Sequence, residues 1–298
     1  MKPVIILILF LGLNLTFAAE KKFKIEAKEI SIGKKISGIS QETLLVSADN
    51  RHIAYGAARD GKQFIVLEEK KGAACDGISP SNIHFSPDGK RLAYSARRGE
   101  KQFVVLDGVE GKNYDLIGAR SLIFSSDSQK IAYGAALDGK QFIVINAAEQ
   151  RGYDGIVGGT LTFSPRGNHV AYAAANASGQ FVVIDGKEGD SYEEINSLHF
   201  SPTGEHLVFT AGKEAKARVI FDGIPGAEYN GFGAFVFSPD SKRLAFSAVK
   251  GARKFVVLEG VEQKNYSGIG KMIFSPDSKR FACVVAQGTN RLVVLDGI

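Results

Sequence analysis

Short apolar runs separated by turn residues recur along most of this chain. In the second copy of the pattern, four runs lie at 83–85, 92–94, 103–106 and 114–117, and the turns between them contain Pro-Asp-Gly, Arg-Gly and Asp-Gly. Runs rich in Val, Ile, Phe and Tyr and bounded by such residues are typical of β-strands joined by hairpins. No 3.6-residue period extends far enough to indicate a helix. Each copy therefore predicts four short antiparallel strands.

The copies follow one another at a nearly constant interval. The phrase Phe-Ser-Pro-Asp-Gly, or a variant of it, begins at Val46, Phe85, Phe124, Phe163, Phe200, Phe237 and Phe274, so the interval is 39 and then 37 residues. Four antiparallel strands per unit are typical of one β-propeller blade, and seven units fall within the usual number. Continuous apolar runs such as FVVL fit blades that are buried on both faces. The sequence predicts an all-β fold, a seven-bladed β-propeller of four-stranded antiparallel blades.

The two ends of the chain predict how the ring closes. The last copy stops at residue 298, after its third strand, whereas residues 33–47 align without a gap on residues 111–125 and so supply a fourth strand ahead of the first copy. We expect this N-terminal strand, residues 33–39, to complete the C-terminal blade, which would leave few free sheet edges. A linear solenoid is the alternative, and it would need capping repeats at both ends.

The turn Phe-Ser-Pro-Asp-Gly followed by Lys-Arg-Leu-Ala-Tyr, as in 85–94 and with small changes in 237–246, resembles the WD-like repeat of TolB-type periplasmic propellers. The resemblance covers about residues 33–298. It implies a propeller that acts as an extracytoplasmic interaction scaffold, although similar propellers are also attached to peptidases and to sugar-active enzymes. TolB-like proteins have six blades and an extra α/β domain. This chain has seven apparent repeats and no residues left for such a domain, so a role in the Tol system does not carry across.

The first residues have the layout of a secretory signal peptide. Lys2 gives a positive start, an apolar run follows, and small residues precede a cleavage point after Ala18 or Ala19. An uncleaved anchor would need about 18 or more apolar residues, and Asn14 and Thr16 interrupt this run. We expect a signal peptide at 1–19, a leader at 20–32 and a single propeller domain at 33–298. The protein is then periplasmic or secreted, without a stable membrane span after cleavage.

Composition narrows the functional classes. The chain is 44% hydrophobic and 23% charged, which is typical of a soluble globular protein, and its net charge of +5 is mild. A nucleic-acid partner is not expected, because basic residues are not concentrated beside exposed aromatic residues. The two cysteines, Cys75 and Cys283, occupy aromatic positions of the repeat on different strands. Two buried free thiols are favoured over a disulfide. No cofactor or metal site is expected, and we expect a monomer.

One basic residue begins the second strand of every copy. This basic ring consists of His52, Arg91, Lys130, His169, His206, Arg243 and Arg280. The ring could attract anions to one end of the propeller. The alternative, which we favour, is that each cation pairs locally with the aspartate of the turn three residues earlier. These turn aspartates recur in five copies and are interpreted as turn-forming residues: Asp49, Asp88, Asp127, Asp240 and Asp277.

A second candidate site lies where the chain enters each innermost strand, at the predicted mouth of the central channel. The channel-mouth residues differ between copies, as a specific ligand site would require: Glu42, Asn82, Arg120, Ser121, Thr160, Asn196 and Lys271. Glu42 is the one acid, whereas a glycosidase needs a pair of carboxylates. No histidine lies in a triad motif or at metal-ligand spacing.

These observations favour a non-catalytic propeller that binds another protein, an envelope macromolecule or a ligand. The alternative is a hydrolase or lyase acting on polysaccharide or peptide, with its site around Glu42, Asn82, Arg120 and Lys271. A ligand-binding sensor that uses the same channel mouth also remains open.

Overall fold

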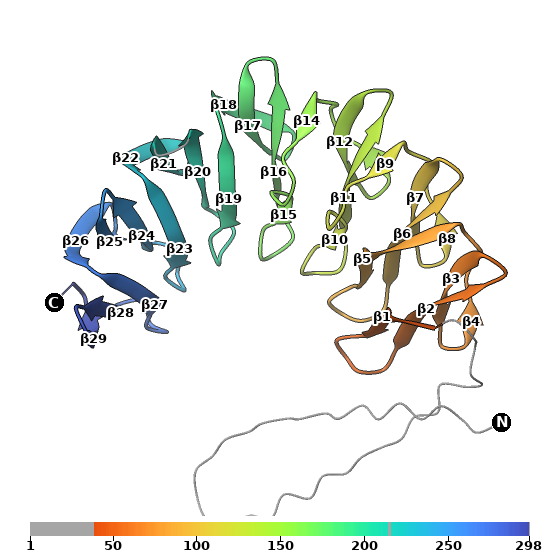
Figure 1. Ribbon diagram of the computed structural model, residues 1–298, viewed down its shortest axis with the longest axis horizontal. Coiled ribbons are helices and arrows are strands. Elements are labelled where there is room, and N and C mark those ends of the chain that lie inside the picture. The colour runs from red at the N-terminus through yellow and green to blue at the C-terminus, as the bar shows by residue number, and fades with distance from the viewer. Residues whose placement is uncertain (1–38, 214–215, 298) are drawn as a thin grey trace, which may run out of the picture.

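The computed structural model describes residues 39–213 and 216–297, and strands dominate them. These residues form seven antiparallel sheets, called sheets 1 to 7 in chain order (Figure 1). Sheet 1 consists of β1 (Ile39–Val46), β2 (Ile53–Arg59), β3 (Lys62–Leu67) and β4 (Lys70–Lys71). Sheet 2 consists of β5 (Gly77–Phe85), β6 (Leu92–Arg98), β7 (Lys101–Leu106) and β8 (Val109–Glu110).

In the next two sheets the innermost strand is split into two short pieces that pair with the same neighbour. Sheet 3 consists of β9 (Leu116–Ile117), β10 (Ile123–Phe124), β11 (Ile131–Leu137), β12 (Lys140–Ile145) and β13 (Ala148–Glu149). Sheet 4 consists of β14 (Gly155–Ile156), β15 (Thr162–Phe163), β16 (Val170–Asn176), β17 (Gly179–Ile184) and β18 (Lys187–Tyr192).

The last three sheets have an unbroken first strand. Sheet 5 consists of β19 (Ile195–Phe200), β20 (Leu207–Lys213), β21 (Lys216–Phe221) and β22 (Ile224–Tyr229). Sheet 6 consists of β23 (Gly231–Phe237), β24 (Leu244–Lys250), β25 (Arg253–Leu258) and β26 (Val261–Tyr266). Sheet 7 consists of β27 (Gly268–Phe274), β28 (Phe281–Gln287) and β29 (Asn290–Leu295).

Each sheet is a meander whose register is fixed by short turns. In sheet 1, Arg59 pairs with Lys62, so a two-residue loop of Asp60 and Gly61 connects β2 to β3. Both loop residues have positive φ, 52° and 74°, which is the backbone of a type I′ hairpin turn. A loop of two residues connects the second and third strands of sheets 2, 3, 4, 6 and 7 as well, so the apolar residues of these third strands reach equivalent core positions.

The predicted fourth strand of the repeat is partly wrong. Residues 114–117 were expected to form one strand of sheet 2, but Tyr114 makes an isolated bridge to Gln102 in sheet 2, and Leu116–Ile117 is β9 of sheet 3. The chain crosses to the next sheet between them. The apolar pattern does not reveal this crossing, because a buried apolar residue lies on each side of it, Tyr114 in sheet 2 and Ile117 in sheet 3.

Sheets 1 to 7 follow one another along an open arc, with the first strands on its inner side and the fourth strands on its outer side (Figure 1). The apolar cores lie between consecutive sheets. One cluster, for example, joins Ile65 of sheet 1 to Tyr94 and Phe103 of sheet 2. The all-β fold of seven blade-like sheets, predicted from the repeat, is confirmed.

Closure of the ring is not seen. Sheet 7 has three strands among the described residues, and its edge strand β29 exposes Leu292, Val293 and Leu295. Of the predicted closing strand, residues 33–38 lie outside the described residues, so closure stays a prediction. The expected signal peptide and leader, residues 1–32, lie outside them as well. In the part of the chain that is described, no helix is long and apolar enough to cross a membrane.

Candidate functional site

One side-chain pair recurs at every contact between neighbouring sheets. It joins a residue at the end of the fourth strand of one sheet, or a few residues beyond it, to a residue in the second strand of the next. We call these the inter-sheet pairs, and they are Cys75–Tyr94, Tyr114–Tyr133, Tyr153–Tyr172, Tyr192–Phe209, Tyr229–Phe246 and Tyr266–Cys283. Four are aromatic pairs with ring centroids 5.7–6.4 Å apart in edge-to-face geometry. Both cysteines are buried and free, as expected, and each lies opposite a tyrosine.

At two of these contacts a salt bridge covers the tyrosine on the outer side of the arc. Between sheets 3 and 4, Arg151 Nη1 lies 2.9 Å from Glu188 Oε1, and Tyr153 Oη donates a hydrogen bond of 2.9 Å to the same oxygen. The Arg151 guanidinium carbon lies 5.9 Å from the centroid of the Tyr153 ring. Burial, followed by the hydrogen bond to Glu188, raises the pKa of Tyr153. The hydroxyl therefore stays protonated as the donor.

The same arrangement is present between sheets 2 and 3. Lys112 Nζ lies 2.7 Å from Glu149 Oε1 and 5.7 Å from the centroid of the Tyr114 ring. We call this arrangement the outer clamp: a cation two residues before the tyrosine, paired with a glutamate in the fourth strand of the next sheet. It fills the outer end of the inter-sheet contact.

Between sheets 4 and 5 all the variable parts of this arrangement are replaced. Asp190 stands where Lys112 and Arg151 stand in their sheets, Phe209 replaces a tyrosine, and Pro225 replaces the glutamate. A cavity of 510 Å³ opens at this place, lined by β18, by Leu207 and Phe209 of β20, and by the turn after β21. Its volume lies within the range of small-ligand pockets. We call it the groove between sheets 4 and 5.

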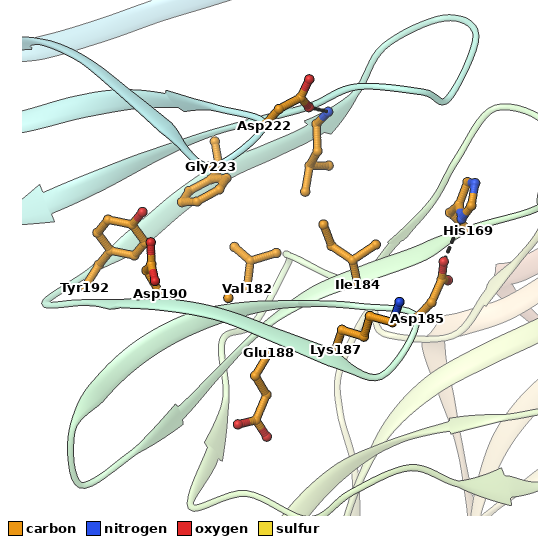
Figure 2. A pocket seen from close by; sticks show the side chains of 13 residues that line it. His169, Val182, Ile184, Asp185, Lys187, Glu188, Asp190, Tyr192, Asp222 and Gly223 are labelled. Carbon is orange, nitrogen blue, oxygen red and sulfur yellow. Dashed lines mark hydrogen bonds and ion pairs between the residues drawn. The ribbon is translucent and has the colours of Figure 1, made fainter.

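The groove has an apolar floor and polar ends. Val182, Leu207 and Phe209 form the floor, and each of the three is less than 9% exposed. Figure 2 shows Asp190 beside Tyr192 at one end, and His169 and Asp185 at the other. Between the residues at this second end, His169 Nδ1 lies 2.6 Å from Asp185 Oδ2. The groove can therefore hold an amphipathic group, with its apolar part on the floor and a positive charge beside Asp190.

The next contact, between sheets 5 and 6, is an internal comparison. It also has a phenylalanine, Phe246, opposite the tyrosine, and Ala227 stands at the position of the cation. Its glutamate is retained as Glu262, and Glu262 Oε1 lies 3.7 Å from Lys250 Nζ. The cavity there is 360 Å³. At this contact the clamp glutamate is therefore kept and pairs with Lys250 in place of the missing cation, and the cavity is smaller than the groove between sheets 4 and 5.

The residues of the basic ring are held by local contacts, but not with the predicted partner. Most pair with the acid that ends the third strand, sixteen residues later, as in Arg91 Nε to Asp107 Oδ2 at 2.9 Å and His206 Nδ1 to Asp222 Oδ2 at 2.6 Å. The other pairs of this kind are His52–Glu68, His169–Asp185, Arg243–Glu259 and Arg280–Asp296. Asn146 stands where the acid would pair with Lys130. Lys130 Nζ instead donates to the carbonyl oxygen of Gly167 in the next sheet at 2.9 Å.

The turn aspartates have a different partner from the one expected. Each accepts a hydrogen bond from the serine two residues earlier, for example Ser86 Oγ to Asp88 Oδ1 at 2.6 Å. This bond is the first cause that lowers the pKa of Asp88, and the other four turn aspartates have lowered pKa values for the same reason. The serine is therefore the hydrogen-bond partner of the turn aspartate, and the cation three residues later adds a smaller electrostatic contribution to the lowered pKa of Asp49, Asp127 and Asp277.

Three channel-mouth residues brace the backbone. Asn82 is 1% exposed and donates from Nδ2 to the Gly118 carbonyl oxygen at 2.9 Å, across the contact between sheets 2 and 3. Ser121 Oγ accepts the Gly134 N–H at 3.1 Å, and Thr160 Oγ1 accepts that of Ala173 at 2.9 Å. Ser121 and Thr160 thus bind the second strand of their own sheet, which pairs with the split first strand.

The other channel-mouth residues do not form one cluster of chemical groups. Arg120, Asn196 and Lys271 are exposed on sheets 3, 5 and 7, and Arg120 lines a 220 Å³ cavity between sheets 3 and 4. The side chain of Glu42 lies outside the described residues. No group of three or more potential metal ligands occurs within 39–213 and 216–297. A ligand-binding role for the channel mouth stays a prediction.

The groove between sheets 4 and 5 was not found from the sequence. The signal was present, because Lys112, Arg151 and Asp190 occupy the same position in consecutive repeats and the third has the opposite charge. The sequence does not show that the residue at this position contacts the next sheet, and the structure does.

Seven successive blade-like sheets define the chain as an all-β repeat protein of the β-propeller type. Among solved structures it is similar to the Dos1 propeller, with 15% identity over 84% of this chain and 77% of that chain and a TM-score of 0.42. It is also similar to the Cps50 (Swd1) propeller of Myceliophteria thermophila, with 14% identity over 89% and 98% and a TM-score of 0.38.

A third similar structure is the propeller domain of the trilobed protease from Pyrococcus furiosus, described as having an open velcro topology. The identity is 16% over 88% of this chain and 93% of that chain, with a TM-score of 0.38. No family model and no curated protein matches the chain. At these levels of similarity the fold is described from the sheets themselves.

Proposed function

We propose that this protein is a non-catalytic, extracytoplasmic propeller that binds a macromolecular partner through the groove between sheets 4 and 5. The observation that carries the proposal is the local break in the repeat. Side chains that fill the outer end of two other contacts are replaced at this one, and a 510 Å³ cavity with an apolar floor takes their place. Departures from a repeat that open a cavity are where a repeat scaffold acquires a specific surface.

The non-catalytic part of the proposal rests on the chemistry of the polar groups. Asn82, Ser121 and Thr160 use their side chains to brace the backbone. In the groove, Asp185 and Asp222 are each engaged by a histidine and by a backbone N–H. The extracytoplasmic part rests on the sequence pattern of residues 1–19.

Site-specific photo-crosslinking in cells that make the protein tests this function. A photoreactive residue replaces Lys187, which is exposed and lines the groove, and in a matched control it replaces Ala148, the exposed equivalent in sheet 3. We expect a defined adduct at Lys187 that is absent at Ala148. No adduct at Lys187, or the same adducts at both positions, would refute binding through the groove.

Two further measurements test the remaining parts. Sequencing of the mature N-terminus should give a chain that begins after Ala18 or Ala19, in the extracytoplasmic fraction. The purified protein should not hydrolyse polysaccharides or peptides. Turnover that disappears in the variant Glu42→Gln with Arg120→Ala would overturn the non-catalytic assignment in favour of a channel-mouth enzyme.

A further inference from the structure

Resting on the proposed function, we infer that the groove between sheets 4 and 5 binds an arginine or lysine side chain carried by an extended segment of a partner protein. The charged head lies between the Asp190 carboxylate and the Tyr192 ring. Its aliphatic stem and the neighbouring apolar residues of the segment cover the floor formed by Val182, Leu207 and Phe209.

The protein itself fills the equivalent space with a cation at two other contacts. Arg151 lies over the ring of Tyr153 and pairs with Glu188, and Lys112 lies over Tyr114 and pairs with Glu149. Between sheets 4 and 5 the tyrosine ring is retained and a carboxylate is still present, now on Asp190. Pro225 replaces the glutamate of the next sheet and the cation is missing, so a cation from outside would regain both a carboxylate and a tyrosine ring as neighbours.

The charge balance of the neighbouring contacts points the same way. The glutamates of the other contacts all have a cation: Glu149 and Glu188 in the outer clamps, Glu110 with Arg98 at 2.7 Å, and Glu262 with Lys250 at 3.7 Å. Asp190 forms no ion pair within the described part of the chain, although its charge lies close enough to Tyr192 to contribute to the raised pKa of that phenol. Asp190 is exposed and ready to pair with a ligand.

The shape of the groove favours a side chain on an extended segment over a free cation. The apolar floor continues from Tyr192 past Val182 to Ile184, which is 36% exposed, and Lys187 lies toward that far end (Figure 2). A small free cation at Asp190 would leave this apolar surface in water. The stem of a lysine or arginine packs well on apolar surface, and flanking apolar residues of an extended segment would cover the rest along β18, the edge strand of sheet 4.

Fluorescence anisotropy with labelled peptides tests the inference on the full-length mature protein. The probe is a seven-residue peptide of alternating valine and threonine around a central arginine, and the comparison peptides carry citrulline or glutamate at that place. We expect the citrulline peptide to bind about tenfold more weakly, the combined effect of one exposed ion pair and one cation–π contact. Asp190→Asn removes the ion pair and keeps the Tyr192 ring, so it should weaken binding of the arginine peptide by a smaller factor, about two- to fivefold.

A variant that rebuilds the repeat gives the sharper test. Asp190→Arg with Pro225→Glu recreates the outer clamp, so the protein's own arginine should occupy the groove. We expect this double variant to unfold at or above the wild-type temperature and to lose peptide binding. The matched control is Ala227→Arg at the contact between sheets 5 and 6, which should bind the arginine peptide with unchanged affinity.

The outcomes separate this inference from the proposed function. Equal affinity for the arginine and citrulline peptides, no detectable binding of either, or unchanged binding by the folded double variant would overturn the cationic ligand. In those cases a persisting adduct at Lys187 would leave the proposed function standing. Absence of that adduct would remove the proposed function itself, whatever the peptides do.

Discussion

Replacing Gln180 by alanine should destabilise the contact between sheets 4 and 5. Gln180 lies in β17, and its Oε1 accepts the backbone N–H of Ile195 at 2.8 Å. Ile195 is 0% exposed, so in the variant its N–H would lose this acceptor where water cannot replace it. An unsatisfied buried donor costs about 1–3 kcal/mol. Glutamines at the same position make this bond at the three preceding contacts: Gln63 to Ile78, Gln102 to Ile117 and Gln141 to Ile156.

Thermal unfolding followed by circular dichroism measures the effect. For a domain of this size 1 kcal/mol changes Tm by about 2–4 °C, so we expect a decrease of about 2–12 °C for Gln180→Ala. The matched control is Lys254→Ala, because Lys254 is the exposed equivalent in sheet 6, and its effect should stay within about 0.5 kcal/mol.

Stacked repeats can also unfold locally, so hydrogen exchange at residue 195 should accelerate in the glutamine variant. A Tm within 1 °C of the wild type together with unchanged exchange at residue 195 would refute the assigned role. Equal decreases for Gln180→Ala and Lys254→Ala would do the same.

Three other properties can be measured on the same protein. Burial raises the pKa of the Cys75 and Cys283 thiols, so Ellman's reagent at pH 8 should label neither within minutes and both after unfolding; rapid labelling of either would contradict their burial. The pKa values of the turn aspartates are lowered in the folded state, so these carboxylates stabilise the fold fully above the unfolded pKa of about 3.9. That stabilisation is lost as pH falls through their pKa values in the folded state. Tm should therefore be steady from pH 7 to 5 and fall below about pH 4, with a smaller fall in Ser238→Ala, whereas a Tm constant down to pH 2.5 would contradict the assignment. If residues 33–39 close the ring, amides of 290–295 should exchange faster in a chain that begins at residue 40, and equal exchange in both chains would exclude closure.

The sequence predicted the sheets well because their boundaries depend on local chemistry. The Phe-Ser-Pro-Asp-Gly phrase ends the first strand of each repeat, and β5 does end at Phe85. The second and third strands of sheet 2, β6 and β7, begin or end where the apolar runs do. The fourth strand was misplaced, because its residues are divided between two sheets by a crossing that leaves the apolar pattern unbroken.

The partners of the basic ring illustrate a second limit. Arg91 pairs with Asp107 because the register of the hairpin, in which Ala93 faces Leu106, brings the start of β6 beside the end of β7. The turn aspartate Asp88 is nearer in sequence, but Ser86 already binds it. The nearest acid in the sequence was therefore the wrong partner to predict. The two-residue loop sets the register of the hairpin, and that register places the acid sixteen residues later beside the cation.

The groove between sheets 4 and 5 could not be recognised in any single repeat, because it depends on positions in two. Comparison with the contact between sheets 5 and 6 indicates which substitutions accompany the larger cavity. Phe246 replaces a tyrosine between sheets 5 and 6, where Glu262 is still paired, and the cavity there is 360 Å³. Between sheets 4 and 5 both members of the outer clamp are also lost, and the cavity is 510 Å³. The cation is absent from both contacts, and the contact that has also lost the glutamate has the larger cavity. Restoring both members of the clamp in Asp190→Arg with Pro225→Glu should therefore close the groove, although Phe209 is unchanged.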